Sequence, residues 1–589
     1  MRLLRWIGYV IVGLFATVGA LLVIAVVGTA LAWRNLMGPT EPVPDSAVLQ
    51  LDMRAGIVET EPYYVPLISD FDRSLTLHDL VEALHEAADD DRIAGLIVRV
   101  NGSGLGLAQI QELRDAVAAF RAGGKRAVAF AETFGETGTG TLDYYLASAF
   151  DEVWLQPSGD LDITGILIEQ PFMRELLTDL GVVPEFAARE DYKAAVEMFT
   201  RDSMSQAHRQ NLEQLLHSWM DQIAGDIAGD RVLDNATVQD LIDRAPHGAA
   251  AALEAGLVDG LAYSDEIEAA AIEQAGDGAA IYDLADYAWL VEPPADALPI
   301  ALVYGVGPIH LGTGQSGFGG GGDIDADILV DALRKARALD NVAAVILRID
   351  SPGGSYVASD TIWREVERTR EAGIPVIVSM GNVAASGGYF IAAPASAIVA
   401  ERATVTGSIG VVSGKFVLDD LWADIGIDWD VIGFGANAGM YSPNRPFTEP
   451  QWQQLNETLD RIYADFLQRV ADGRNLDAAA VRASAQGQVW SGEDALERGL
   501  IDELGGLHRA IEVALEEGGH PPDAAYDLIV VRGDRFGVDK PFEESASLWA
   551  DLRAATTLLA EFSRWLAIRQ HISDRPALLA DPALSEPLR

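Results

Sequence analysis

The sequence predicts an α/β fold, with two tandem repeats in one chain preceded by one N-terminal transmembrane helix. The duplication is visible because AGLIVRV at residues 94–100 returns as AAVILRI at 343–349, and GLVD at 256–259 returns as GLID at 499–502. Short β-branched runs also alternate with longer helical patterns, which is typical of βαβ units around a largely parallel sheet. Because duplicated units are built to stack on each other, we expect a functional site between the two copies.

The first element is a predicted membrane anchor. No residue from 6 to 33 is charged, and this run exceeds both the roughly 20 apolar residues that cross a bilayer and the roughly 7–15 of a secretory signal. We interpret it as an uncleaved signal anchor, with a cleaved signal as the alternative. Arg2 and Arg5 precede the run, whereas Arg34 is the only basic residue in the stretch just after it. The positive-inside bias therefore places the N-terminus in the cytoplasm and the bulk of the chain outside.

The later elements follow in order along the chain. Predicted strands lie at 93–100, 126–131 and 152–155 in the first copy, around a predicted helix at 107–122, and at 298–304, 341–349, 375–380 and 396–400 in the second. The chain thus divides into an N-terminus and anchor (1–34), a proline-containing linker (35–47), an N-terminal repeat (48–290), a C-terminal repeat (291–532) and a tail (533–589). Apolar residues at helical spacing in the tail predict an amphipathic helix packed on the body or on another subunit, with membrane-surface contact as the alternative.

The composition narrows the classes of function. A formal net charge of −47 argues against nucleic-acid binding, which needs a basic face. We expect no metal and no other cofactor, and the glycine-rich stretch 312–322 lacks the lysine and the serine or threonine of a phosphate-binding loop. Arginine cannot give up its proton in a protein, whereas a buried lysine can. Only five of the 42 basic residues are lysines, namely Lys125, Lys193, Lys335, Lys415 and Lys540.

Two glycine-rich turns carry the predicted chemistry. DSPGG at 350–354 directly follows a predicted strand, and AASGGY at 384–389 follows the next strand and leads into an apolar helix. A serine flanked by small residues at such a turn exposes its hydroxyl, and paired glycines let backbone N–H groups approach a substrate oxygen. The turns therefore offer a nucleophile, Ser386, and donor sites near Gly354 and Gly387. The alternative is that Ser386 is a purely structural turn residue.

The base for this hydroxyl is predicted in the other copy. No histidine occurs between His310 and His508, whereas YKAAVE at 192–197 puts Lys193 among small apolar neighbours. Loss of hydration favours the neutral amine, and lowering its pKa from about 10.4 to about 7 costs about 5 kcal/mol, which burial supplies. A neutral Lys193 accepts the serine proton. The alternative is an ordinary surface lysine.

Six motifs, taken together, resemble one protein family. They are YKAAVE at 192–197, FTRDSMS at 199–205, SPGG at 351–354, ASGGY at 385–389, TGSIG at 406–410 and GQVWSG at 487–492. Over roughly residues 1–530 the sequence resembles the long, internally duplicated form of signal peptide peptidase A. That family consists of Ser-Lys proteases related in fold to the Clp protease and crotonase group. The resemblance therefore implies two Clp protease/crotonase-like repeats.

Carried over to this chain, the resemblance makes Ser386 the nucleophile and Lys193 the general base. It implies an oxyanion hole from the backbone N–H of Gly387 and that of Gly353 or Gly354, and the sequence does not choose between the last two.

The two copies support this division of labour. At an offset of 245 residues Ser386 corresponds to Thr141, and Lys193 corresponds to Ala438. The first copy has lost a plausible nucleophile and the second has lost the lysine. These complementary losses leave a single dyad per chain, assembled between the halves.

The resemblance implies a membrane-anchored serine endopeptidase that degrades cleaved signal peptides and other hydrophobic peptides through an acyl-enzyme. It also implies a homo-oligomer, with a tetramer favoured, on the outer side of the bacterial inner (cytoplasmic) membrane. Two alternatives stay open. A crotonase-like acyl-CoA enzyme also uses paired backbone donors but needs neither a nucleophilic serine nor export. A non-catalytic membrane scaffold is disfavoured because Ser386 and Lys193 are intact while their counterparts have decayed.

Overall fold

The computed structural model describes residues 42–61, 74–136, 138–291, 293–312 and 323–534. The predicted anchor at 1–34 and the predicted helix of the tail lie outside these residues. Within the described ranges, every helix is too short or too polar to cross a membrane.

The first half of the chain folds around a six-stranded sheet in which every pairing is parallel. In spatial order its strands are β8 (Gly260–Leu261), β4 (Glu152–Leu155), β3 (Arg126–Ala131), β2 (Ile93–Arg99), β1 (Ala47–Asp52) and β9 (Ala280–Asp283). Most residues of β2 and β3 are buried, as expected for parallel strands covered on both faces.

The second half repeats this arrangement. Its main path runs β18 (Val489–Trp490), β16 (Val405–Gly407), β14 (Val376–Ala385), β13 (Ala344–Ser351), β10 (Leu298–Val306) and β20 (Tyr526–Val530), with β15 (Ala397–Ala400) bridging β14 to β19 (Glu503–Leu504). Only the β16–β18 pairing in this sheet is antiparallel. The repeated AGLIVRV and AAVILRI segments form most of β2 and β13, which occupy central positions in their sheets. The predicted α/β architecture with parallel sheets is confirmed.

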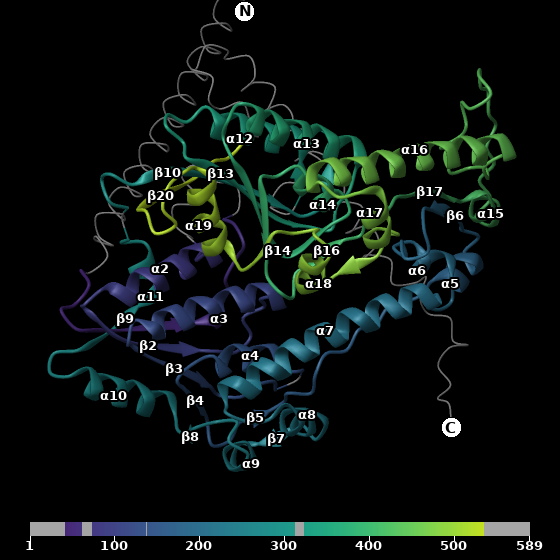
Figure 1. The fold of residues 1–589 in the computed structure, drawn as a ribbon. Coiled ribbons are helices and arrows are strands. Elements are labelled where there is room, and N and C mark those ends of the chain that lie inside the picture. The colour runs from purple at the N-terminus through teal and green to yellow at the C-terminus, as the bar shows by residue number, and fades with distance from the viewer. Residues whose placement is uncertain (1–41, 62–73, 137, 292, 313–322, 535–589) are drawn as a thin grey trace, which may run out of the picture. The chain divides into compact units, whose positions relative to one another are not determined.

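Helices cover both faces of each sheet. On the first sheet, α2 (Leu77–Asp89) and α3 (Leu107–Ala122) pack on one face and α10 (Ser264–Ala275) on the other. On the second, α12 (Ala326–Arg337) and α13 (Tyr356–Glu371) pack on one face and α19 (Leu507–Glu517) on the other. Figure 1 shows α2 and α3 between the strands of the first sheet and α19, so the helical layer of the first half packs directly against the second half.

The other elements connect these layers. The helices are η1 (Met53–Ala55), α4 (Thr141–Ser148), α5 (Arg174–Asp179), α6 (Glu197–Thr200), α7 (Gln206–Asp230), α8 (Asn235–Asp243), α9 (Ala249–Glu254), α11 (Leu284–Ala288), α14 (Gly387–Ala392), α15 (Asp419–Asp424), α16 (Glu449–Arg474), α17 (Ala478–Ser484) and α18 (Gly492–Glu497). The short strands are β5 (Asp160–Leu161), β7 (His247–Gly248), β11 (Ile309–His310) and β12 (Ile324–Asp325).

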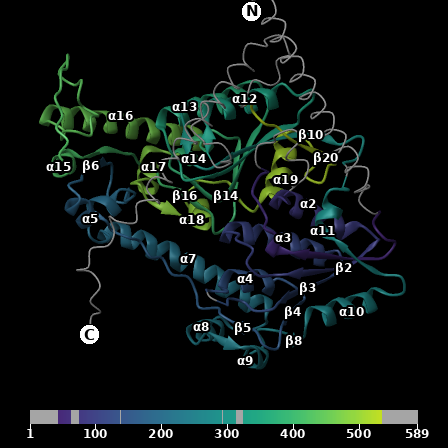
Figure 2. The same ribbon diagram turned by 180° about the vertical axis from the view of Figure 1, so that it is seen from behind.

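A two-stranded antiparallel ladder joins the two halves. β6 (Val183–Ala188) from the first half pairs with β17 (Val412–Val417) from the second. The long helix α16 contacts both strands, and the same corner is seen from behind in Figure 2. The segment that follows β6, which contains Lys193, is thereby held against the second half.

A buried ionic cluster also ties the halves together. Arg348 of β13 is only 1% exposed, and its guanidinium contacts Glu59 at 2.6 Å and Glu112 of α3 at 2.8 Å. Glu112 also accepts a hydrogen bond from the backbone N–H of Leu507 at 2.9 Å. Because a buried charge is tolerated only when it is paired and hydrogen-bonded, this cluster fixes how α3 lies on the second sheet. Arg348 stands three residues before Ser351, where the SPGG turn begins.

Candidate active site

Ser386 lies at the turn between β14 and α14, in a strained backbone conformation. Its φ is 54° and its ψ is −117°, a region that side-chain-bearing residues rarely adopt. The turn is held from both sides, because the Ser386 N–H donates to the Gly407 carbonyl at 2.9 Å and its carbonyl accepts from the Phe390 N–H at 2.9 Å. A strand-to-helix turn of this kind lifts a serine hydroxyl out of the sheet.

The glycine turn at 353–354 lies against the Ser386 turn. Gly353 and Gly387 approach so closely that a Cβ on Gly353 would stand 2.5 Å from the Gly387 nitrogen. Gly353 also has a φ of 96°, which favours glycine. Its N–H donates to Ser351 Oγ at 3.2 Å, whereas Gly354 and Gly387 both line the cavity beside Ser386. The backbone therefore favours Gly354 over Gly353 as the second donor.

Lys193 reaches this turn from the first half of the chain. Its Nζ lies 3.0 Å from Ser386 Oγ, although the two residues are 193 positions apart in sequence. The side chain is 8% exposed, and burial lowers the pKa of Lys193 to about 8. Close backbone packing fixes the segment, since a Cβ on Gly487 would stand 2.5 Å from the Lys193 nitrogen. The structure thus brings together the two side chains that the sequence singled out.

Ser408 is a site residue to which the sequence reasoning gave no role. Lys193 Nζ donates to both the hydroxyl and the carbonyl oxygen of Ser408, each at 2.9 Å. Ser408 has a φ of 52°, and its N–H donates to the Gln488 carbonyl at 2.7 Å. The available signal was the TGSIG motif at 406–410, which places a second hydroxyl in a small-residue turn.

The equivalent position in the first half is filled by its own side chains. The Thr141 hydroxyl donates to the Gly165 carbonyl at 3.1 Å. Asp143 accepts the backbone N–H of Gly102 at 2.9 Å and the Ser103 hydroxyl at 3.3 Å. The Asp143 carboxylate therefore accepts hydrogen bonds from the turn at 102–103, which corresponds in the first half to the SPGG turn of the second.

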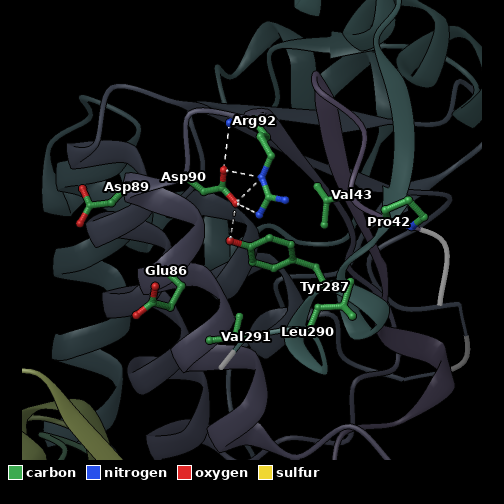
Figure 3. Close-up of a pocket in the computed structure, with 9 residues that line it drawn as sticks. All are labelled: Pro42, Val43, Glu86, Asp89, Asp90, Arg92, Tyr287, Leu290 and Val291. Carbon is green, nitrogen blue, oxygen red and sulfur yellow. Dashed lines mark hydrogen bonds and ion pairs between the residues drawn. The ribbon is translucent and has the colours of Figure 1, made fainter. Parts of the chain in front are cut away.

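One cavity lies beside Ser386 and Lys193, and a larger one lies elsewhere, in the first half. The one beside Ser386 has a volume of about 80 Å³ and includes Lys193 in its lining. Another, of about 540 Å³, lies in the first half between α2, α11 and the start of the described chain (Figure 3). There the Asp90 carboxylate is paired with Arg92 and accepts the Tyr287 hydroxyl at 3.1 Å. That cavity is remote from the candidate residues and has no part in the chemistry considered below.

The chain is similar to known peptidases. The family model of Peptidase family S49 matches residues 119–276 and 368–519. The chain is 31% identical over 504 residues to "Serine protease SPPA, chloroplastic" of Arabidopsis thaliana, covering 83% of this chain and 72% of that one. It is 34% identical over 464 residues to "Protease 4" of Haemophilus influenzae, covering 75% and 73%.

Fold and relatives together define a serine protease. The chain belongs to Peptidase family S49, and the resemblance to signal peptide peptidase A is confirmed. Among solved structures, a ClpP1 mutant from Listeria monocytogenes aligns with 34% of this chain and 90% of that chain at 14% identity, with a TM-score of 0.22. With a TM-score this low, the Clp protease/crotonase-like character of the repeats stays a prediction.

Proposed function

We propose that this serine protease is a membrane-anchored endopeptidase that cuts hydrophobic peptides, cleaved signal peptides among them, with Ser386 as nucleophile and Lys193 as general base. The observation that carries the proposal is the 3.0 Å contact between Lys193 Nζ and Ser386 Oγ beside a small, partly open cavity. The two groups come from different halves of the chain, which explains why each half kept only one of them.

The geometry supports a neutral Lys193 amine that accepts a hydrogen bond from the Ser386 hydroxyl and does not donate one to it. A neutral amine has two N–H bonds and one lone pair. When both N–H groups point at the hydroxyl and carbonyl oxygens of Ser408, the lone pair is left for the Ser386 hydroxyl. Ser408 is therefore proposed as the residue that orients Lys193, and burial keeps a substantial fraction of the amine neutral near pH 8.

The proposed reaction has two stages. Lys193 takes the proton from Ser386 Oγ as the oxygen attacks the substrate carbonyl, and the N–H groups of Gly354 and Gly387 stabilise the resulting oxyanion. The Lys193 ammonium then gives its proton to the leaving amine, which produces an ester between Ser386 and the first peptide fragment. Lys193 next deprotonates a water that hydrolyses this ester and restores the free hydroxyl.

Location and substrate rest on the sequence. The charge-free run from 6 to 33 supports a single-pass anchor with the catalytic part on the outer side of the bacterial cytoplasmic membrane. The resemblance to signal peptide peptidase A supports released signal peptides as substrates.

A direct test separates this proposal from the acyl-CoA alternative. The purified full-length chain, in detergent, is incubated in parallel with a hydrophobic signal-sequence peptide and with an enoyl-CoA thioester. We expect internal cleavage of the peptide, read by mass spectrometry, and no hydration of the thioester. Hydration of the thioester that persists in Ser386→Ala, with an uncut peptide, would favour the crotonase-like enzyme instead.

We also propose that the chain assembles with copies of itself, as a tetramer by family resemblance. Within one chain, residues 183–188 of the first half pair with 412–417 of the second. At the 245-residue offset their counterparts are 428–433 and 167–172, and the structure assigns neither segment to a strand. Ile432 is fully exposed and Leu167 is 80% exposed. A second copy supplies the missing partner when its 167–172 pairs with 428–433 of the first.

If the chains assemble in this way, an aspartate placed in either segment is expected to lower the mass of the oligomer. Ile432→Asp or Leu167→Asp is expected to reduce the particle from several chains to one, because each removes one side of the same head-to-tail contact. Light scattering on the detergent-solubilised chain measures the change. Val232→Asp is the matched control, since Val232 is 90% exposed but lies outside both segments. An assembly that withstands both substitutions would rule out this contact.

A further inference from the structure

The cavity beside Ser386 is small and walled by aromatic rings. From it we infer that the enzyme selects a short aliphatic side chain, alanine to valine in size, at the residue whose carbonyl Ser386 attacks. This inference rests on the proposed peptidase function and names the determinants of its specificity as Tyr356, Phe390 and Phe466.

The cavity is placed to receive that side chain. Lys193, Ser386, Gly354 and Gly387 all line it, so a carbonyl carbon at Ser386 Oγ puts its own residue at the cavity mouth. The rest of the lining is almost wholly apolar and comprises Tyr356, Phe390, Val411, Val412, Ile462 and Phe466, together with Ser359 and Gly410. An apolar lining favours an uncharged side chain, because a buried polar group would lose its hydration without gaining a partner.

One part of the cavity lining is formed by three rings that pack against one another. Phe390 lies between the other two, with its ring centroid 5.8 Å from that of Tyr356 and 5.0 Å from that of Phe466. Phe390 and Phe466 are 2% and 4% exposed. Rings packed at interior density cannot move aside for a larger ligand without disturbing the core behind them.

The width of the cavity is fixed by a tie between α13 and α16. The Tyr356 hydroxyl, on α13, donates to Asp465 Oδ2, on α16, at 2.8 Å. Burial and, after it, the bond to Asp465 raise the pKa of Tyr356 to about 12, so the donor proton is retained at neutral pH. Arg469 of α16 reinforces the tie by pairing with Asp360 of α13 at 3.1 Å and by stacking over Trp363 at 3.6 Å.

The volume sets the size limit. An apolar cavity of about 150 Å³ holds a benzene ring. The cavity beside Ser386, of about 80 Å³, is about half that size. It therefore leaves room for a short aliphatic side chain but not for the ring of phenylalanine, and leucine is expected to fit less well than valine.

The inference is tested with four hydrophobic peptides that differ only at the residue before the cleaved bond, which is alanine, valine, leucine or phenylalanine. For the full-length wild type we expect comparable kcat/KM for alanine and valine, a decrease for leucine, and a decrease of at least about 100-fold for phenylalanine. Mass spectrometry of the products confirms which bond is cut in each peptide.

Two variants test whether the rings set the size preference, and a third variant is the control. Phe466→Leu shortens the wall and is expected to raise the phenylalanine-to-valine ratio of kcat/KM at least about tenfold. Tyr356→Phe keeps the ring but removes the tie to Asp465, and is expected to raise the leucine-to-valine ratio several-fold. Phe150→Leu is the matched control, because Phe150 is 3% exposed in the core of the first half, and it leaves both ratios unchanged.

Each outcome decides between the two claims. Cleavage of the phenylalanine peptide by the wild type as fast as the valine peptide overturns the size limit and leaves the peptidase proposal standing. Ratios that Phe466→Leu does not move overturn the assignment to the wall. Failure to cut any of the four peptides overturns the proposed function and this inference together.

Discussion

Ser386→Ala is expected to reduce peptide cleavage on the order of 10⁶-fold, the scale seen when a serine nucleophile is removed from a catalytic unit. The reason is that no covalent intermediate forms without Oγ, and the proposed oxyanion donors, Gly354 and Gly387, would alone supply only a residual rate. The measurement is kcat/KM for a hydrophobic peptide, with circular dichroism to show that the variant is folded.

Thr141 provides the matched control for this prediction. Thr141→Ser places a serine at the position of the first half that corresponds to Ser386, but Asp143 already occupies the nearby donors. The corresponding lysine position, Ala438, carries no amine. We therefore expect Thr141→Ser to retain wild-type cleavage and to give no rescue when combined with Ser386→Ala. Substantial turnover by Ser386→Ala would refute the assignment of the nucleophile.

Lys193→Met is expected to lower kcat by at least about 10⁴-fold, with a much smaller change in KM. Methionine keeps the length and the apolar packing of the side chain but cannot accept the Ser386 proton. Lys193→Arg is expected to be equally inactive, because a guanidinium stays protonated. Steady-state kinetics on the same peptide measure both variants.

Another lysine of the second half serves as the comparison. Lys415 is 9% exposed and donates to three backbone carbonyls, among them that of Met440 at 2.8 Å. Lys415 holds a loop in place by hydrogen bonds to backbone carbonyls, whereas Lys193 contacts the hydroxyl of Ser386. Lys415→Met is therefore expected to lower thermal stability, whereas Lys193→Met lowers turnover. A Lys193→Arg enzyme with wild-type kcat would show that the amine is not the base.

Much of the fold was predictable because strands and helices are local patterns. The strands predicted at 93–100 and 341–349 overlap β2 and most of β13, since buried parallel strands need continuous apolar residues. The ladder between β6 and β17 was not predicted. Its strands are more than 200 residues apart in sequence, and half-exposed strands of six residues carry no marker of their partner.

The candidate site was likewise predictable only in part. Ser386 and Lys193 could be predicted from the sequence because each stands among unusually small residues. The structure places their side chains 3.0 Å apart. The role of Ser408 depends on a φ of 52°, which residue types alone do not reveal. The choice between Gly353 and Gly354 depends on Ser351, whose hydroxyl already accepts the Gly353 N–H. The cavity wall includes Phe466, which the topology of α16 brings back to Ser386 from 80 residues further along the chain.

The central claim is that a neutral Lys193 removes the Ser386 proton, and the pH dependence of acylation tests it most directly. The rate at which a serine-reactive fluorophosphonate modifies Ser386 is measured on the full-length chain between pH 6 and pH 9.5. Because burial lowers the pKa of Lys193 to about 8, the neutral amine gains about tenfold per pH unit below that value and levels off above it. We predict a rate that follows this curve and that collapses in Lys193→Met. A rate that is flat from pH 6 to pH 9.5, or that Lys193→Met leaves intact, would contradict the account.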